Sequence, residues 1–200
     1  ERFLKISGNK VESRPIKGTR PRGATASEDA ALAQELRASE KDKAENLMIV
    51  DLLRNDLGRT AKLGSVKVPV LLGLESYATV HHLVSVVAAE LEAGRNAVDL
   101  MHAAFPGGSV TGAPKIRAME VIAELEPTER GPYCGAIGYL SASGAMDTNI
   151  VIRTLLIDGD TISFQVGGGI VADSDPAAEL AETEATAAGW AATVDSLRRR

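Results

Sequence analysis

Residues 65–72 (Ser-Val-Lys-Val-Pro-Val-Leu-Leu) and 75–89 (Glu-Ser-Tyr-Ala-Thr-Val-His-His-Leu-Val-Ser-Val-Val-Ala-Ala) are rich in β-branched residues and alternate in polarity. This pattern is typical of strands, and Gly73 between the runs indicates a connection. We therefore predict two paired antiparallel strands. Nearer the N-terminus, residues 2–7 and 10–14 flank Gly8-Asn9 and predict a hairpin. Three further strands are predicted at residues 131–141, 148–156 and 161–166.

Five other segments predict helices. Residues 27–38 and 39–57 each begin at a serine, which can accept a backbone hydrogen bond as an N-cap. Residues 96–104 end before Pro106, and residues 115–124 follow a glycine-rich turn. The last helix is expected to start with Asp175 as N-cap and Pro176 at its first position. The chain thus combines helices with antiparallel strands.

Composition narrows the classes of function. The 200 residues are 44% hydrophobic and 24% charged, which suits one globular domain. A net charge of -5, without a basic stripe interleaved with aromatics, argues against nucleic-acid binding; the terminal arginine cluster 198–200 is better explained as a helix-end feature. No apolar run is long enough to span a membrane, and no signal peptide is visible. The lone Cys134 fits a reducing compartment, so we expect a cytoplasmic protein without membrane or nucleic-acid partners.

Two acidic pairs are candidates for metal binding. Glu179 and Glu182 lie three residues apart on one face of the last helix, where either a cation between them or a solvated helix face is possible. Asp42 and Glu45 form a second pair, and Glu45 shares its face with Met48 and other apolar residues. Glu45 is therefore expected to point inward, where a carboxylate needs a cation or a hydrogen-bond donor. The segment Arg54-Asn55-Asp56 is expected to end that helix.

Two glycine-rich turns are candidates for anion binding. Gly167-Gly168-Gly169 leaves backbone N–H groups unshielded before the last helix. The turn 107–114 leads into a helix and carries Ser109 and Thr111, although it lacks the ending of a nucleotide-binding P-loop. Arg153 interrupts the predicted strand 148–156, either at a sheet edge or holding a carboxylate.

A lysine and a histidine complete the set of candidates. Lys17 lies beside a glycine in the extended, proline-flanked segment 14–23, and Arg14, Arg20 and Arg22 are near in sequence and would favour a neutral amine. His81 and His82 face opposite sides of their predicted strand, so at most one can reach a site. For His82 both a core position and a site position remain open.

Six motifs in order resemble the chorismate-utilising enzymes, and among them the aminodeoxychorismate synthases, over essentially all 200 residues. They are Pro-Ile-Lys-Gly-Thr-Arg-Pro-Arg-Gly, Ala-Glu-Asn-Leu-Met-Ile-Val-Asp-Leu-Leu-Arg-Asn-Asp, Val-His-His-Leu-Val-Ser, Gly-Ser-Val-Thr-Gly-Ala-Pro-Lys, Cys-Gly-Ala-Ile-Gly-Tyr and Gly-Gly-Ile-Val-Ala-Asp-Ser. The resemblance implies an α+β fold, an α/β sandwich of large antiparallel sheets flanked by helices. It also implies that residues 1–200 are the C-terminal part of one chorismate-binding domain whose upstream part is absent.

The resemblance assigns ligands to the candidates. Magnesium is the implied cofactor, with Glu45 and Glu182 matching its principal ligands and Asp42 and Glu179 the acids beside them. Chorismate is the implied substrate. The residues that match its binding groups are Thr111, Tyr139, Arg153, Gly168 and Gly169. Family members often have a lysine one turn after the second glutamate, where this chain has Thr186.

The implied reaction is the amination of chorismate to 4-amino-4-deoxychorismate, which we class with transaminases, for para-aminobenzoate and folate biosynthesis. Lys17 matches a covalent nucleophile, Glu1 the acid that protonates the departing ring hydroxyl, and His82 a histidine near the ring. A glutamine amidotransferase subunit or domain would supply ammonia. Two alternatives stay open: anthranilate synthase component I or a related chorismate-converting enzyme, and a non-catalytic chorismate-binding or subunit-docking module.

Overall fold

The computed structural model describes residues 1–172 and 174–198, in two compact units. Unit 1 comprises residues 1–127 and 136–150, and unit 2 comprises residues 128–135 and 151–200. The side chains of the terminal arginine cluster lie outside the described residues. No helix among the described residues combines the length and apolarity needed to cross a membrane.

Unit 1 is built on one antiparallel sheet. The strand order is β3-β5-β2-β1-β7-β6, and β4 also pairs with β5. The strands are β1 (Arg2–Ser7), β2 (Lys10–Arg14), β3 (Ile16–Pro21), β4 (Lys67–Ser76), β5 (Val80–Glu90), β6 (Ala136–Leu140) and β7 (Met146–Ile150). The predicted β1–β2 hairpin is confirmed, and the long β5 carries β3 and β2 one after the other along one edge. Strand β5 therefore joins three neighbours.

The predicted antiparallel pair of strands is confirmed, but its turn is not at Gly73. The connection lies at residues 77–79, where Tyr77 N donates to Val80 O. Gly73 lies inside β4, where the register with β5 shifts and Leu72 adopts a positive φ of 54°. Ser85 Oγ accepts from Leu72 N at 3.0 Å and holds this irregularity. The glycine therefore marks a β-bulge within a strand.

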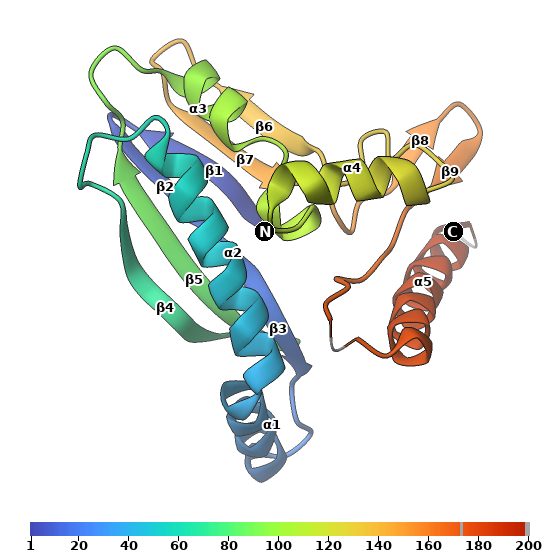
Figure 1. Ribbon diagram of the computed structural model, residues 1–200. Helices are drawn as coiled ribbons and strands as arrows, with labels where there is room; N and C mark the ends of the chain where they lie inside the picture. The colour runs from blue at the N-terminus through green and yellow to red at the C-terminus, as the bar shows by residue number, and fades with distance from the viewer. Residues whose placement is uncertain (173, 199–200) are drawn as a thin grey trace. The chain divides into compact units, whose positions relative to one another are not determined.

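Helices α1 (Ala26–Ala38) and α2 (Glu40–Gly58) pack on the same sheet, and Figure 1 shows α2 lying across it beside β5. Ser39 caps α2 as predicted, with Oγ accepting from Asp42 N at 3.3 Å. For α1 the predicted cap is wrong: Thr25, not Ser27, accepts the N-terminal hydrogen bond, from Glu28 N. Either residue has the required hydroxyl, so sequence alone did not separate two caps two residues apart.

The core of unit 1 lies between α2 and the sheet. Leu4, Leu36, Ile49, Leu57 and Leu83 are completely or almost completely buried there. Asn46 is buried among them: its Nδ2 donates to Leu83 O at 3.3 Å and its Oδ1 accepts from Ser85 Oγ at 2.6 Å. These bonds compensate the desolvation of the amide and fix how α2 lies on β5.

Three shorter helical segments of unit 1 lie between β5 and β6 in the sequence. They are α3 (Ala97–Ala104), the 3-10 turn η1 (Gly108–Val110) and α4 (Lys115–Leu125). Asn96 and Asp99 form a reciprocal capping box at the start of α3. Helices α3 and α4 confirm the predicted segments.

Unit 2 contains the hairpin of β8 (Leu156–Asp158) and β9 (Thr161–Ser163), together with α5 (Pro176–Arg198). Asp175 caps α5 as predicted, with Oδ1 accepting from Ala178 N at 2.9 Å. The predicted strand 148–156 is wrong in its second half, because β7 ends at Ile150 and Arg153 has a left-handed φ of 52°. The strand predicted at 131–141 is confined to β6, since Cys134 has a φ of 64°.

Candidate functional site

Lys17 lies on a β-bulge of β3. Ile16 pairs with Val84 and Thr19 with His82, so Lys17 and Gly18 together stand opposite the single residue Leu83. A bulge breaks the alternation of a strand and redirects the side chains on it, and such bulges are common beside active sites. The proline-flanked segment that the sequence indicated as extended is therefore a strand with a local irregularity at the predicted nucleophile.

Gly18 brings this bulge against the acidic end of α2. Its φ is +90°, and a Cβ at this position would lie 2.9 Å from Leu36 Cδ1 and 3.0 Å from Asp42 Cβ. Only glycine fits both the backbone conformation and the space. Asp42 is thus placed beside the strand that carries Lys17, and its carboxylate accepts a hydrogen bond from Arg20 Nη2 at 3.3 Å.

The three arginines near Lys17 are each bound to a carboxylate. Arg14 pairs with Glu75, Arg20 with Glu35 as well as Asp42, and Arg22 with Asp29. Their positive charge is therefore compensated locally. The expectation that these arginines act on the Lys17 amine is not supported by these contacts, because their guanidinium groups are directed to other partners.

Glu45 is half-buried at the margin of the α2 interface, not inside it. The buried face of α2 is formed by Asn46, Ile49, Val50, Leu53, Asp56 and Leu57. Met48, which was expected to share the buried face, is 37% exposed. The buried face of α2 is therefore shifted by about one residue from the predicted face, and the polar residue Asn46 lies at its centre.

Both histidines of β5 are buried. His82 Nδ1 lies 2.8 Å from Thr19 Oγ1, so His82 contacts the strand that carries Lys17, two residues beyond it. Asp42 and His82 therefore flank this bulge from opposite faces of the sheet, because the face of β5 that bonds α2 through Ser85 is the one that His82 does not share. On the opposite face, His81 lies 2.7 Å from Ser76 Oγ through Nδ1 and 2.9 Å from Asp29 Oδ1 through Nε2.

Asp29 is the most perturbed carboxyl of this region. Two hydrogen bonds from Arg22, at 2.6 and 2.8 Å, lower the pKa of Asp29 well below its usual range, and Gly23 N adds to the effect. The ionised carboxylate ties α1 to the segment after β3 and, through His81, to β5. We interpret this network as the support of the bulge-bearing strand.

The other predicted residues of unit 1 lie at its surface or are half-buried. Glu1 is half-buried before β1, and its backbone carbonyl accepts from Ile150 N at 3.1 Å. Thr111 follows η1, and its hydroxyl donates to Gly107 O at 2.9 Å. Tyr139 is 59% exposed on β6, opposite Asp147. The Thr111 hydroxyl keeps its lone pairs available to accept a hydrogen bond.

Unit 2 brings the glycine-rich turn and α5 together. Glu179 is only 8% exposed, and its Oε1 accepts from Ser174 Oγ at 2.7 Å. A Cβ on Gly168 would lie 3.2 Å from Glu179 Oε2, so the turn passes close to this carboxylate. Glu182 and Gly169 are exposed, as is Thr186, which donates to Glu182 O. Arg153 lies in an exposed bend, so its predicted position within a strand is wrong.

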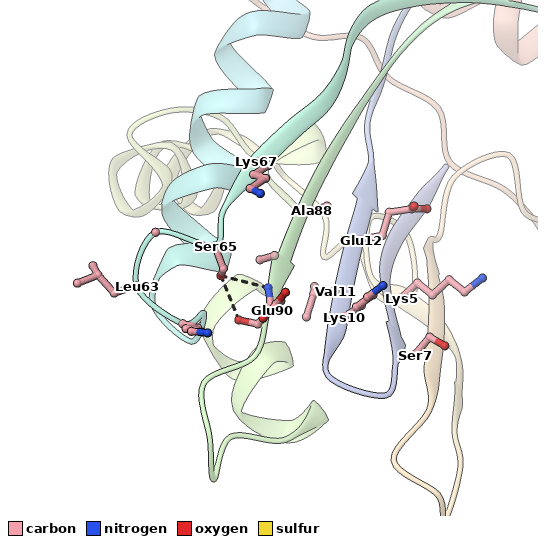
Figure 2. Close-up of a pocket in the computed structure, with 13 residues that line it drawn as sticks. Lys5, Ser7, Lys10, Val11, Glu12, Leu63, Ser65, Lys67, Ala88 and Glu90 are labelled. Atoms are coloured by element: carbon pink, nitrogen blue, oxygen red, sulfur yellow. Dashed lines mark hydrogen bonds between the residues drawn. The ribbon is translucent and has the colours of Figure 1, made fainter.

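A cavity of about 310 Å³ lies beside Glu179. It is lined by Ile170, Ser174, Pro176, Glu179, Leu180 and Thr183. A larger groove of about 610 Å³ lies on unit 1 at the end of the sheet, and none of the predicted site residues lines it. Figure 2 shows lysines that line it, with Lys5 and Lys10 on the β1–β2 hairpin and Lys67 at the start of β4.

The predicted metal ligands are divided between the units, with Asp42 and Glu45 in unit 1 and Glu179 and Glu182 in unit 2. Among the described residues no group of three or more histidine, cysteine or acidic side chains could hold a metal ion. The acids nevertheless suit a hard cation chemically, because they supply only oxygen donors and Glu179 is a buried carboxylate.

Sequence reasoning missed a buried ion pair between Asp56 and Lys115. Asp56, expected to end α2, lies inside the helix and is 3% exposed, and its Oδ2 accepts from Lys115 Nζ at 2.5 Å. Burial raises the pKa of Asp56, opposed by its bond to Lys115. The signal was present: Asp56 follows Ile49 and Leu53 at helical spacing and therefore belongs to the apolar face.

The comparisons with known proteins all indicate one family. The family described as chorismate binding enzyme matches residues 1–191. Aminodeoxychorismate synthase component 1 of Klebsiella aerogenes is 57% identical over 92% of this chain and 41% of its own length. Anthranilate synthase component 1 of Streptomyces coelicolor is 51% identical, over 92% of this chain and 36% of its own. The chain thus spans less than half the length of these relatives.

The crystal structure of anthranilate synthase component I from Streptococcus pneumoniae has a TM-score of 0.81 and 44% identity, and the match covers 92% of this chain and 40% of that one. This similarity and the antiparallel sheet with flanking helices confirm the predicted fold class.

Proposed function

Since the chain belongs to the family of chorismate-binding enzymes, we propose that it acts as aminodeoxychorismate synthase component 1, aminating chorismate to 4-amino-4-deoxychorismate. Identity favours this product, because the Klebsiella aerogenes relative of that name is 57% identical and the Streptomyces coelicolor anthranilate synthase 51%. The chain corresponds to 41% of the length of the Klebsiella protein.

Lys17 carries this proposal. It stands on a bulge of β3, with His82 bonded to Thr19 on one side and Asp42 against Gly18 on the other. A reactive amine needs a fixed backbone and polar groups within reach of the substrate, and a bulge backed by a buried network provides the first of these. A lysine at an ordinary strand position would not require the adjacent glycine.

The proposed chemistry proceeds in two displacements. The amine nitrogen of Lys17 forms a bond to ring carbon C2, the ring double bonds shift, and the C4 hydroxyl leaves as water with a proton from Glu1. Ammonia then forms a bond to C4, the double bonds shift back, and the C2–N bond breaks to release Lys17 as the amine. Chorismate and ammonia thus give 4-amino-4-deoxychorismate and water.

The remaining candidates bind the substrate in this proposal. Glu45 and Glu182 would hold magnesium, with Asp42 and Glu179 beside them, and the ion would supply positive charge for the ring carboxylate of chorismate. Tyr139, Arg153, Gly168 and Gly169 bind the enolpyruvyl carboxylate of chorismate, and Thr111 contributes a hydroxyl to the substrate. A glutamine amidotransferase partner supplies ammonia.

The test uses the whole protein with chorismate, magnesium and ammonium chloride, which bypasses the amidotransferase. The product is identified by mass and ultraviolet spectrum. Lys17→Ala is expected to abolish 4-amino-4-deoxychorismate formation, and mass spectrometry of quenched wild type should find a substrate adduct on the peptide that contains Lys17. Lys62→Ala, an exposed lysine of the large groove, is the matched control and should leave turnover unchanged.

The alternatives give different results in the same assay. Anthranilate as product would establish the second enzyme class, and calorimetric binding of chorismate without any product would establish a non-catalytic binding module. Full turnover by Lys17→Ala would remove the covalent role of Lys17.

A further inference from the structure

We propose that Lys115 and Asp56 are positioning residues, which hold the turn that carries Thr111 in a fixed place on the helix that carries Asp42 and Glu45. The inference rests on the proposed function for its kinetic consequence, but the geometry stands by itself. All of these residues belong to unit 1.

Lys115 makes two short contacts at the start of α4. Its Nζ donates to Asp56 Oδ2 of α2 at 2.5 Å and to Ala104 O, the last residue of α3, at 2.7 Å. The Lys115 side chain is 14% exposed and that of Asp56 5%. A single ammonium thus joins three helices. Arg59, directly after α2, adds a parallel contact by donating to Ala103 O at 3.0 Å.

The position of Lys115 is unfavourable by local rules. It is the first residue of α4, where the positive end of the helix dipole disfavours a cation, and α4 has no side-chain N-cap. The cost is offset only by the Asp56 carboxylate and by the carbonyl end of α3, which is the negative end of a dipole. A residue that opposes its own helix but completes a tertiary contact is more readily explained by that contact.

The anchored segment is the turn between α3 and α4. At its start, a Cβ on Gly108 would lie 2.5 Å from Leu52 Cδ2 of α2, and one on Gly107 would lie 2.5 Å from Ile150 Cδ1. The backbone of the turn therefore packs directly on α2 at one end, and Lys115 fastens it to α2 at the other. Thr111 lies between these two fixed points, bonded to Gly107 O.

The consequence concerns substrate affinity. Because the ends of the turn are fixed to α2, the Thr111 hydroxyl keeps a constant relation to the acids of that helix. Releasing one end is expected to move Thr111 without altering Lys17. A displacement of about 1 Å at a positioning group can reduce catalytic efficiency on the order of 100-fold. We therefore expect Lys115→Met to raise KM for chorismate about 10- to 100-fold, with a smaller effect on kcat.

The experiment separates positioning from simple stabilisation with a second variant. Asp56→Leu/Lys115→Met replaces the buried pair by apolar side chains, which commonly restores stability. If the pair positions the turn, this double variant regains its thermal stability but not its KM, because no donor reaches Ala104 O. Recovery of KM together with stability would overturn the proposal. Arg117→Met removes an exposed pair with Glu120 on the same helix and is the matched control.

A readout independent of turnover keeps this inference distinct from the proposed function. Hydrogen exchange of the backbone amides of residues 108–112 in the whole protein is expected to become at least 10-fold faster in Lys115→Met and in the double variant, and to stay unchanged in Arg117→Met. Unchanged exchange in both would overturn the proposal even if the protein makes 4-amino-4-deoxychorismate. Faster exchange in a protein with another product would leave it standing.

Discussion

Substituting Gly18 by alanine tests the bulge that presents Lys17. The glycine has a φ of +90°, and the added methyl group would lie 2.9 Å from Leu36 Cδ1 and 3.0 Å from Asp42 Cβ. The backbone conformation costs an L-residue about 1–2 kcal/mol, and overpacking adds about 1–3 kcal/mol. The free energy of unfolding is therefore expected to fall by about 2–5 kcal/mol.

Urea unfolding of the whole protein, followed by circular dichroism, measures this loss. With an m-value of about 2 kcal/mol/M, the midpoint should fall by about 1–2.5 M. Gly58→Ala is the control, since Gly58 ends α2 with no atom within 4 Å of an added Cβ. Alanine there should stabilise by about 0.5–1 kcal/mol. A midpoint for Gly18→Ala within about 0.3 M of wild type would refute the reasoning about the bulge.

Three further outcomes are expected. Because Arg22 lowers the pKa of Asp29, the stability that this carboxylate contributes is present above its ordinary pKa of about 3.9 and is lost as the pH falls below it. The difference in urea midpoint between wild type and Asp29→Asn should therefore be constant above about pH 5 and smaller at pH 3. A difference that stays constant down to pH 3 would contradict the lowered pKa of Asp29. Asn46→Leu should lower the free energy of unfolding by about 2–3 kcal/mol, since Ser85 Oγ and Leu83 O lose their buried partner; calorimetric melting checks this, with Asn55→Leu at an exposed α2 position as control. Lys115→Met should lower the free energy of unfolding, measured in urea, by about 3–5 kcal/mol, because it leaves the buried Asp56 carboxylate unpaired. A loss below about 1 kcal/mol would show that Asp56 is already neutral.

The sequence predicted most elements of the fold because their signals are local. Ser39 and Asp175 accept the hydrogen bonds expected of N-caps, and Gly8-Asn9 joins the expected hairpin. The errors come from residues whose conformation depends on distant partners. A glycine such as Gly73 is equally typical of a turn and of a bulge. The hydrogen bond from Leu72 N to the Ser85 hydroxyl of β5, which accompanies the bulge, depends on tertiary pairing that the local sequence does not reveal.

The candidate residues were predicted from motifs, whereas their surroundings depend on tertiary pairing. Arg20 and Asp42 lie 22 positions apart, and no local pattern predicts that they form an ion pair. The same holds for Asp56 and Lys115, 59 positions apart. Periodicity alone could have placed Asp56 on the buried face of α2, but its partner could be found only in three dimensions.

Strand β3 pairs with β5 alone among the described residues, so Lys17 lies on an outer strand of the sheet. Exposed outer strands invite hydrogen bonding by a second polypeptide, which leads to aggregation. Pro21 at the end of the strand has no N–H to donate to a second polypeptide, and the β-bulge at Lys17 and Gly18 disrupts the register that such pairing requires. The β-bulge that carries Lys17 thus also protects this edge strand from pairing with a second chain.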